Sequence, residues 1–194
     1  MEEITLQHGT QLSTIPSNPA VFVRRGSPAE VSRAACEAQA AFQLIFFHAD
    51  TGGRNLEAGL DARAGAYCNA MREKCGWQAQ RCIVIAPRHE TEAWILADPN
   101  AVTAALGYNG NPAAIGLPAN ATAAEALIDP KQTLTDAVKA VRGGSRPFDA
   151  QQIAAAIAQC QSLANLRLGA SFRAFERHLH LALADLRCVY PLLR

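Results

Sequence analysis

The chain has 194 residues, of which 49% are hydrophobic, and a formal net charge of +1 at pH 7. This length fits one domain with a small helical appendage, and the apolar share can form a real core. The balanced charge argues against a strongly basic, stand-alone nucleic-acid binder, while a local basic patch stays open. The uninterrupted apolar runs are too short to span a bilayer, so we expect no membrane partner.

Six cysteines lie at positions 36, 68, 75, 82, 160 and 188. They form no C-x-x-C pair, and the seven-residue spacing of three of them matches no zinc framework. Several lie in apolar segments, where a free cysteine behaves as a small hydrophobic residue. The acidic start, Met1-Glu-Glu, is not followed by the apolar segment of a secretory signal. We therefore predict buried, reduced thiols in a cytoplasmic protein.

Strand and helix patterns alternate in the first half of the chain. The expected elements are a strand at 20–23, a helix from Ser27 and Pro28 to about 40, a strand at 42–47, a loop at 51–55, a helix at 56–74 and a strand at 81–86. Serine followed by proline is typical of a helix start. Alternation of strands and helices predicts right-handed crossovers and a parallel sheet.

The second half is helical. The expected elements are a short helix at 90–97, a helix from Asp98 and Pro99 to 106, a loop at 107–120, a helix from Asp129 and Pro130 to Gly143, a helix at 150–162 and a last helix. The last helix carries one apolar stripe, which predicts packing on the body of the protein: Phe172, Phe175, Leu179, Leu183 and Leu186. His178 and His180 point to different faces of it, and we expect both at the surface.

Polar residues follow the two strongest strand patterns directly. Leu44–Phe47 runs into His48-Ala-Asp50, and Ile83–Ala86 runs into a segment with His89, Glu90 and Glu92. In parallel sheets, ligands bind at the carboxyl ends of the strands. If the two strands are neighbours, their carboxylates converge, and Mg²⁺ prefers such hard oxygen ligands.

Each acidic candidate has a structural alternative. Asp50 is either a metal ligand or part of a turn, and His48 on the same strand face either supports it or makes a structural hydrogen bond. Glu90 and Glu92 are either ligands or ordinary acidic residues of a first helical turn. Apolar residues follow Glu92 directly, so its helix is expected to be packed deeply and its carboxylate to need a partner.

Other candidates are basic or structural. Arg88 is either a phosphate contact or a solvated surface residue. Lys131, in a first helical turn, either shares a phosphate with free N–H groups or lays its stem over the core. We expect Trp94 in the core and Asp98 as a helix cap. The sequence has no Walker loop, G-x-G-x-x-G, G-x-S-x-G or H-E-x-x-H motif, which excludes the enzyme classes built on them.

These motifs together resemble a known family. The chain contains F-F-H-A-D, then V-I-A-P-R-H-E-T-E-A-W-I-L-A-D, then I-D-P-K and a closing F-R-A-F-E-R-H-L, over roughly residues 42–187. This order is similar to a large bacterial family of TOPRIM-like domains of unknown function with a T-E-A-W-x-L-x-D signature. Its members often lie beside ATPase genes in phage-defence loci.

The resemblance implies an α/β fold with a parallel, TOPRIM-like sheet flanked by helices. The core would span 1–110, and a helical extension at 111–194 would pack on it. One departure is that residues 1–19 show no apolar run ending in Glu, so the first strand and helix of such a core are missing. A second is that the expected D-x-D reads His48-Ala-Asp50.

Two functions follow as expectations. The first is a Mg²⁺- or Mn²⁺-dependent nuclease or phosphoryl-transfer enzyme with Asp50, Glu90 and Glu92 at the metal, His48 supporting, and Arg88 and Lys131 on phosphates. The second is a non-catalytic subunit that binds a partner ATPase or a nucleic acid through a degenerate site. A small-nucleotide phosphohydrolase is a third, weaker idea. DNA or RNA preference and oligomeric state are not specified by the sequence.

Overall fold

The computed structural model describes residues 26–41, 43–52, 65–144 and 149–187, with two compact units. Of these, unit 1 comprises residues 26–49, 65–85 and 175–187, and unit 2 comprises 50–52, 86–144 and 149–174. The sequence-based division at residue 110 falls inside unit 2. The expected strand at 20–23 and most of the expected loop at 51–55 lie outside the described residues.

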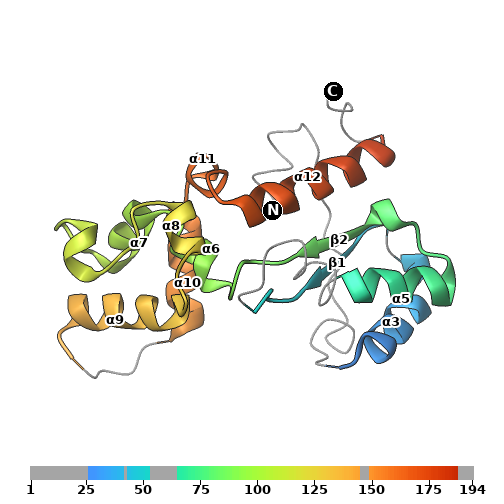
Figure 1. Ribbon diagram of the computed structural model, residues 1–194, viewed down its shortest axis with the longest axis horizontal. Helices are drawn as coiled ribbons and strands as arrows, with labels where there is room; N and C mark the ends of the chain where they lie inside the picture. Colours follow the sequence, from blue (N-terminus) through green and yellow to red (C-terminus); the bar gives the residue numbers. More distant parts are fainter. Residues whose placement is uncertain (1–25, 42, 53–64, 145–148, 188–194) are drawn as a thin grey trace. The chain divides into compact units, whose positions relative to one another are not determined.

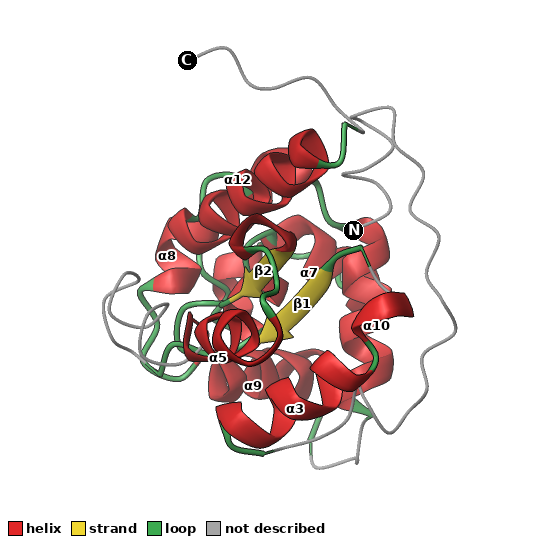
Figure 2. Ribbon diagram, turned by 90° about the vertical axis from the view of Figure 1, so that its right-hand side faces the viewer, coloured by secondary structure: helices red, strands yellow, loops and turns green. Residues whose placement is uncertain are grey.

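Unit 1 combines the described strands with helices. In chain order it holds α3 (Pro28–Glu37), the 3-10 turn η1 (Gln39–Ala41), β1 (Ile45–His48), α5 (Ala66–Cys75), the 3-10 turn η3 (Ala79–Arg81), β2 (Cys82–Ile85) and the second half of α12 (Ala170–Asp185). Figures 1 and 2 show the strands between the α3–α5 pair and this half of α12.

The described strands confirm the predicted parallel pairing. β1 and β2 lie side by side in the same direction, with Ile45 opposite Cys82 and His48 opposite Ile85. Both strands are shorter than the apolar runs predicted. The described residues thus form a mixed α/β structure, mostly helical, around a two-stranded parallel sheet.

Helix α3 begins as predicted. Ser27 accepts a hydrogen bond from the Glu30 N–H, and the Glu30 side chain accepts one from the Ser27 N–H. This reciprocal capping box satisfies two backbone donors that a helix start otherwise leaves unpaired. Helix α5 packs beside α3. Its Tyr67 also stacks on Phe47 of β1, with ring centroids 5.1 Å apart.

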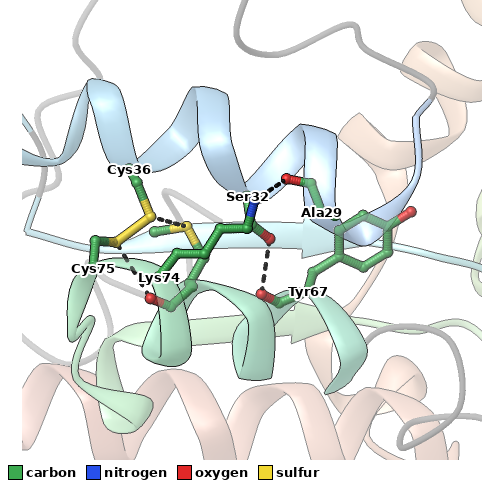
Figure 3. Close-up of a disulfide and its surroundings, with 7 residues drawn as sticks. Ala29, Ser32, Cys36, Tyr67, Lys74 and Cys75 are labelled. Atoms are coloured by element: carbon green, nitrogen blue, oxygen red, sulfur yellow. Dashed lines mark hydrogen bonds between the residues drawn. A yellow bond between two sulfur atoms is a disulfide. The ribbon is translucent and has the colours of Figure 1, made fainter.

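The prediction of reduced thiols is wrong for four cysteines. Cys36 of α3 is bonded to Cys75 of α5, and Cys68 of α5 to Cys82 of β2, with Cα–Cα distances of 5.9 and 5.7 Å. Figure 3 shows the first disulfide beside α3 and α5. Cys160 is free and exposed. Because disulfides are rare in reducing cytosol, this finding bears on the cytoplasmic location, which stays a prediction.

The disulfides cross-link a unit whose fully buried apolar side chains include Met71, Ile83, Leu179 and Leu183. Their sequence separations are 39 and 14 residues. In the chain-entropy view, closing loops of this size stabilises the fold by about 4 and about 3 kcal/mol, taken singly. The two loops overlap in sequence, so these contributions are not additive.

Unit 2 is helical in its described part. It holds α6 (Glu92–Ile95), α7 (Pro99–Leu106), the 3-10 turn η4 (Pro112–Ile115), α8 (Ala121–Glu125), α9 (Pro130–Arg142), α10 (Ala150–Cys160), α11 (Leu163–Leu166) and the first half of α12. The helices expected near 99–106, 130–143 and 150–162 are confirmed. Helices α8 and α11 and the turn η4 were not predicted.

Capping residues set where the helices of unit 2 begin. Asp98, Asn120, Asp129 and Asp149 each accept a hydrogen bond from a backbone N–H of the first turn of α7, α8, α9 and α10. Glycine ends two of these helices in the left-handed conformation, Gly107 after α7 and Gly143 after α9. The helices enclose one apolar cluster that includes Leu96, Val102, Leu134, Val138 and Ile157.

Helix α12 confirms the predicted apolar stripe at four positions. Phe172, Phe175, Leu179 and Leu183 are buried. The prediction that His180 lies at the surface is wrong, because its side chain is only 6% exposed. The buried arc of this helix is wide enough to include the position next to Leu179. Among the described residues, no helix is both long and apolar enough to cross a membrane.

A carboxylate from α8 caps α12. The residue before α12 is Gly169, which has no side chain to cap the helix. Glu125, 5% exposed, accepts hydrogen bonds from the N–H groups of Ala170 and Ser171, at 2.9 Å each, and from the Ser171 hydroxyl. The same hydroxyl accepts a 2.7 Å bond from the Trp94 indole N–H. These bonds connect α6, α8 and α12 inside unit 2.

Gly169 leaves the space that this carboxylate occupies. A Cβ added to Gly169 would lie 2.7 Å from the Glu125 Oε1. We expect Gly169→Ala to lower the free energy of unfolding by about 1–3 kcal/mol, as overpacking does. Urea denaturation measures the change. The double variant with the shorter side chain, Gly169→Ala with Glu125→Asp, should show a smaller loss than the two single changes added. Strict additivity would contradict this account.

Candidate active site

The backbone pairing of the strands continues beyond their ends. The Ala49 N–H donates to the Ile85 carbonyl at 3.0 Å, and the Thr51 N–H donates to the Pro87 carbonyl at 3.2 Å. The register of the sheet, carried on by two residues, thus sets Asp50 opposite Pro87. The prediction that Asp50 and the segment after β2 meet at one sheet edge is confirmed at the level of the backbone.

Thr51 joins the two segments a second time. Its side chain is fully buried, and its hydroxyl oxygen accepts a 3.1 Å hydrogen bond from the His89 N–H. Both residues belong to unit 2. The loop after β2 is therefore attached to the chain that follows β1 by two bonds to a single residue.

This loop contains a strained turn. His89 has a φ of 65°, which is uncommon for a residue with a side chain. The Glu90 N–H donates to the Arg88 carbonyl across it at 2.9 Å. A bond from residue i+2 to residue i with a positive central φ is the pattern of the rarer, strained γ-turn. Strain of this kind is concentrated at functional sites.

Two side chains of the turn each have a buried polar atom, a hydrogen-bond donor in one and an acceptor in the other. The Arg88 Nε and the Glu90 Oε2 are shielded from solvent and have no hydrogen-bond partner among the described residues. The Asp50 Oδ1 is also shielded. A buried donor or acceptor without a partner costs about 1–3 kcal/mol, so the Arg88 Nε and the Glu90 Oε2 are each suited to a bound group that supplies the missing contact.

Glu92 is the first residue of α6 and is half-buried. Thr91 precedes the helix at the N-cap position, and its side chain makes no capping hydrogen bond. The Gln161 side chain donates to the Trp94 and Ile95 carbonyls at 2.6 and 3.1 Å and so fixes the other end of α6. Glu92 is thereby held on a short helix anchored in the core of unit 2.

The remaining predicted residues lie elsewhere. His48 ends β1 and is exposed. Lys131 is exposed in the first turn of α9, where Asp129 accepts the Gln132 N–H at 2.7 Å. Since Pro130 has no N–H and the Asp129 carboxylate is already there, this helix start offers a phosphate few donors. The phosphate role of Lys131 stays a prediction.

Among the described residues, no three His, Cys, Asp or Glu side chains are grouped as a protein-only metal site requires. Mg²⁺ is usually held by one or two carboxylates together with substrate phosphates and water. The geometry therefore leaves open a site that forms only with a phosphate-bearing ligand.

The signature residues around the loop have structural roles. Trp94 packs edge-to-face on Phe172 at 5.2 Å, as expected for a core residue. Asp98 is confirmed as the cap of α7, and its second oxygen accepts the Ser162 N–H at 3.1 Å. From the sequence, Thr51 was expected only as part of a turn or cap with Asp50, because a threonine after an acidic residue carries no distinctive pattern.

Unit 1 contains a hollow, away from the residues predicted as the site. It measures about 130 Å³ and is lined by Ala79, Gln80, Cys82, His178 and Leu181. Partial burial against this hollow lowers the pKa of His178, and the positive charge of Arg177 lowers it further. His178 therefore stays neutral to lower pH than a free histidine does.

Comparison with family models, with curated proteins and with solved structures found no match to this chain. The candidate site therefore stands on its own geometry.

The Thr51 anchor can be tested through stability. We expect Thr51→Val to lower the free energy of unfolding by about 1–3 kcal/mol, because the His89 N–H would lose its buried acceptor while the side chain keeps its shape. Thr51→Ser retains the hydroxyl and serves as the matched variant. Thermal or urea denaturation compares the two. A valine variant at least as stable as the serine variant would show that this hydrogen bond contributes nothing.

The lowered pKa of His178 predicts a stability change on acidification. Below the ordinary value of 6.5, the unfolded chain binds a proton that the folded chain still refuses. The free energy of unfolding should therefore fall as pH falls from 6.5 to the lower folded-state pKa. His178→Gln should flatten this part of the curve. Denaturation from about pH 8 to about pH 5 measures it, and NMR titration should show the pKa rising in Arg177→Gln.

Proposed function

We propose that this chain is a TOPRIM-like, metal-dependent phosphoryl-transfer protein, with a phosphodiester as its substrate. Asp50, Glu90 and Glu92 would hold Mg²⁺ or Mn²⁺, and Arg88 would contact phosphate. His48 and Lys131 would have supporting roles. The observation that carries the proposal is the continued pairing of the strand ends, with the Thr51 N–H bonded to the Pro87 carbonyl.

The chemistry of the loop supports a ligand with both a cation and an anion. The shielded oxygen of Glu90 is an acceptor suited to a metal ion, and the shielded Nε of Arg88 is a donor suited to a phosphate oxygen. A metal phosphate supplies both partners at once. The rigid attachment of the loop through Thr51 would keep these atoms in position before the ligand arrives.

The acidic residues would bind the metal ion, and the basic residue would bind the phosphate. A divalent metal, when bound, activates water and neutralises charge on the scissile phosphate. The carboxylates of Asp50, Glu90 and Glu92 would orient that ion, and the Arg88 guanidinium would hold the non-bridging oxygens. The γ-turn at His89 would direct the side chains of residues 88 and 90 toward the same metal phosphate.

The rival function is a non-catalytic subunit that binds a partner ATPase or a nucleic acid. The net charge of +1 is close to neutral and gives the chain no overall basic character for binding nucleic acid by itself. This favours the role of a subunit that acts with a partner. This rival requires no metal at the loop. Metal binding therefore separates the two proposals.

Calorimetric titration with Mn²⁺ tests the site directly. We expect saturable binding by the parent chain, weakened by about tenfold or more in Glu90→Gln and Glu92→Gln. The same variants should lose Mg²⁺-dependent nicking of plasmid DNA or cleavage of RNA. Panels of DNA, RNA and small nucleotides in the same assay identify the substrate.

The matched control is Glu73→Gln, which removes an exposed carboxylate from α5. It should bind Mn²⁺ as the parent does. No saturable heat with the parent chain, or equal binding by the loop variants and the control, would remove the metal site and favour the non-catalytic subunit.

A further inference from the structure

We propose that the two disulfides of unit 1 form a redox-responsive clamp on α5. A dithiol reductant would open it, because each cysteine pair takes up two electrons and two protons while the reductant closes its own disulfide. The helices of unit 2 would stay folded through this change. The cysteine clamp is defined here as Cys36–Cys75 together with Cys68–Cys82.

The clamp holds α5 near both ends. Cys68 lies in its first turn, and Cys75 is its last residue. Residues seven apart lie two turns apart on nearly the same helix face. From that face one disulfide runs to α3 and the other to β2, so the two neighbours of α5 are each joined to it covalently.

Noncovalent contacts of this helix are made mainly with α3, and also with β1, where Tyr67 stacks on Phe47. Met71 is its fully buried residue, with its Sδ 3.7 Å from the Cys36 Sγ and its carbonyl oxygen 3.3 Å from the Cys75 Sγ (Figure 3). Ser32 donates to the Tyr67 carbonyl, and the Lys74 ammonium donates to the Ala29 carbonyl at an exposed position. Hydrogen bonds near solvent add little net stability.

The apolar cluster around α5 is small and contains the clamp itself. Ala35, Phe47, Met71 and Cys82 are its buried members, and the other clamp cysteines are among the partly buried residues packed on them. A two-stranded sheet is marginal without further support. Opening the disulfides therefore removes the covalent part of what keeps α5 in place and leaves its noncovalent packing on α3 and β1.

The clamp is not fully buried. Cys36, Cys68 and Cys75 are each partly exposed, so both disulfides have a residue at the surface. Thiol–disulfide exchange requires access to a sulfur atom. A dithiol can thus attack the folded protein without prior unfolding, which distinguishes a responsive clamp from a buried permanent cross-link.

Unit 2 has no comparable dependence. Cys160 is the cysteine in its sequence range, and it is free. Its apolar cluster includes fully buried residues from several helices, such as Leu96, Val102 and Ile157. Reduction therefore acts on one unit selectively.

Hydrogen exchange measured by mass spectrometry on the full chain tests the proposal. After oxidation in glutathione buffer, intact mass under non-reducing conditions should show the two disulfides. Dithiothreitol should then lower the protection of α5 amides by about tenfold or more, and leave α7 and α9 within about twofold. The variant with Cys36, Cys68, Cys75 and Cys82 all changed to Ser should show rapid α5 exchange that dithiothreitol does not alter.

Paired variants assign the effect to each bridge. Cys36→Ser with Cys75→Ser should leave an intermediate, still reducible protection in α5, and Cys160→Ser should respond like the parent. The proposal is overturned if α5 protection is equal in the oxidised and reduced chains. It is also overturned if α7 and α9 lose protection in parallel, or if the four thiols stay free in the oxidising buffer.

Discussion

The parallel backbone pairing of β1 and β2 is the constraint from which the candidate site follows. Because side chains alternate along a strand, a slip of one residue in the register would move each side chain, including those of Asp50 and Thr51, to the other face. The register is extended past the strands by the bond between the Thr51 N–H and the Pro87 carbonyl. Thr51 can then accept the His89 N–H. The positions of Arg88 and Glu90 depend on that second bond.

The two units are stabilised by different means. In unit 2, carboxylates and amides cap the helix starts, and apolar side chains from several helices share one core. Glu125 extends the same principle across the chain, since it caps a helix whose preceding residue is glycine. In unit 1 the sheet has two described strands, and covalent bonds between α3, α5 and β2 add to the packing of buried apolar side chains.

Local patterns predicted the features that arise locally. Asp98 and Asp129 were recognised as caps because aspartate before proline is a signal contained in two residues. The strands were found from their apolar runs, and their adjacency from the order of elements. The Glu125–Ser171 pair was missed because 46 residues separate it and neither residue has a motif. The turn at His89 was missed because only a small minority of histidines adopt a positive φ, although histidine is enriched there among residues with a side chain. The disulfides were missed because spacing rules for short cysteine motifs do not consider two cysteines two helical turns apart.

The position of two cysteines on one helix also restricts how the chain can oxidise. Four cysteines allow three pairings. In a formed α5, Cys68 and Cys75 lie about 10 Å apart along the axis, beyond the roughly 7 Å between Cα atoms that a disulfide can bridge. Once this helix has formed, the pairing that joins Cys68 to Cys75 is excluded, and two pairings of the four cysteines remain. Formation of α5 before oxidation would therefore prevent one incorrect set of disulfides.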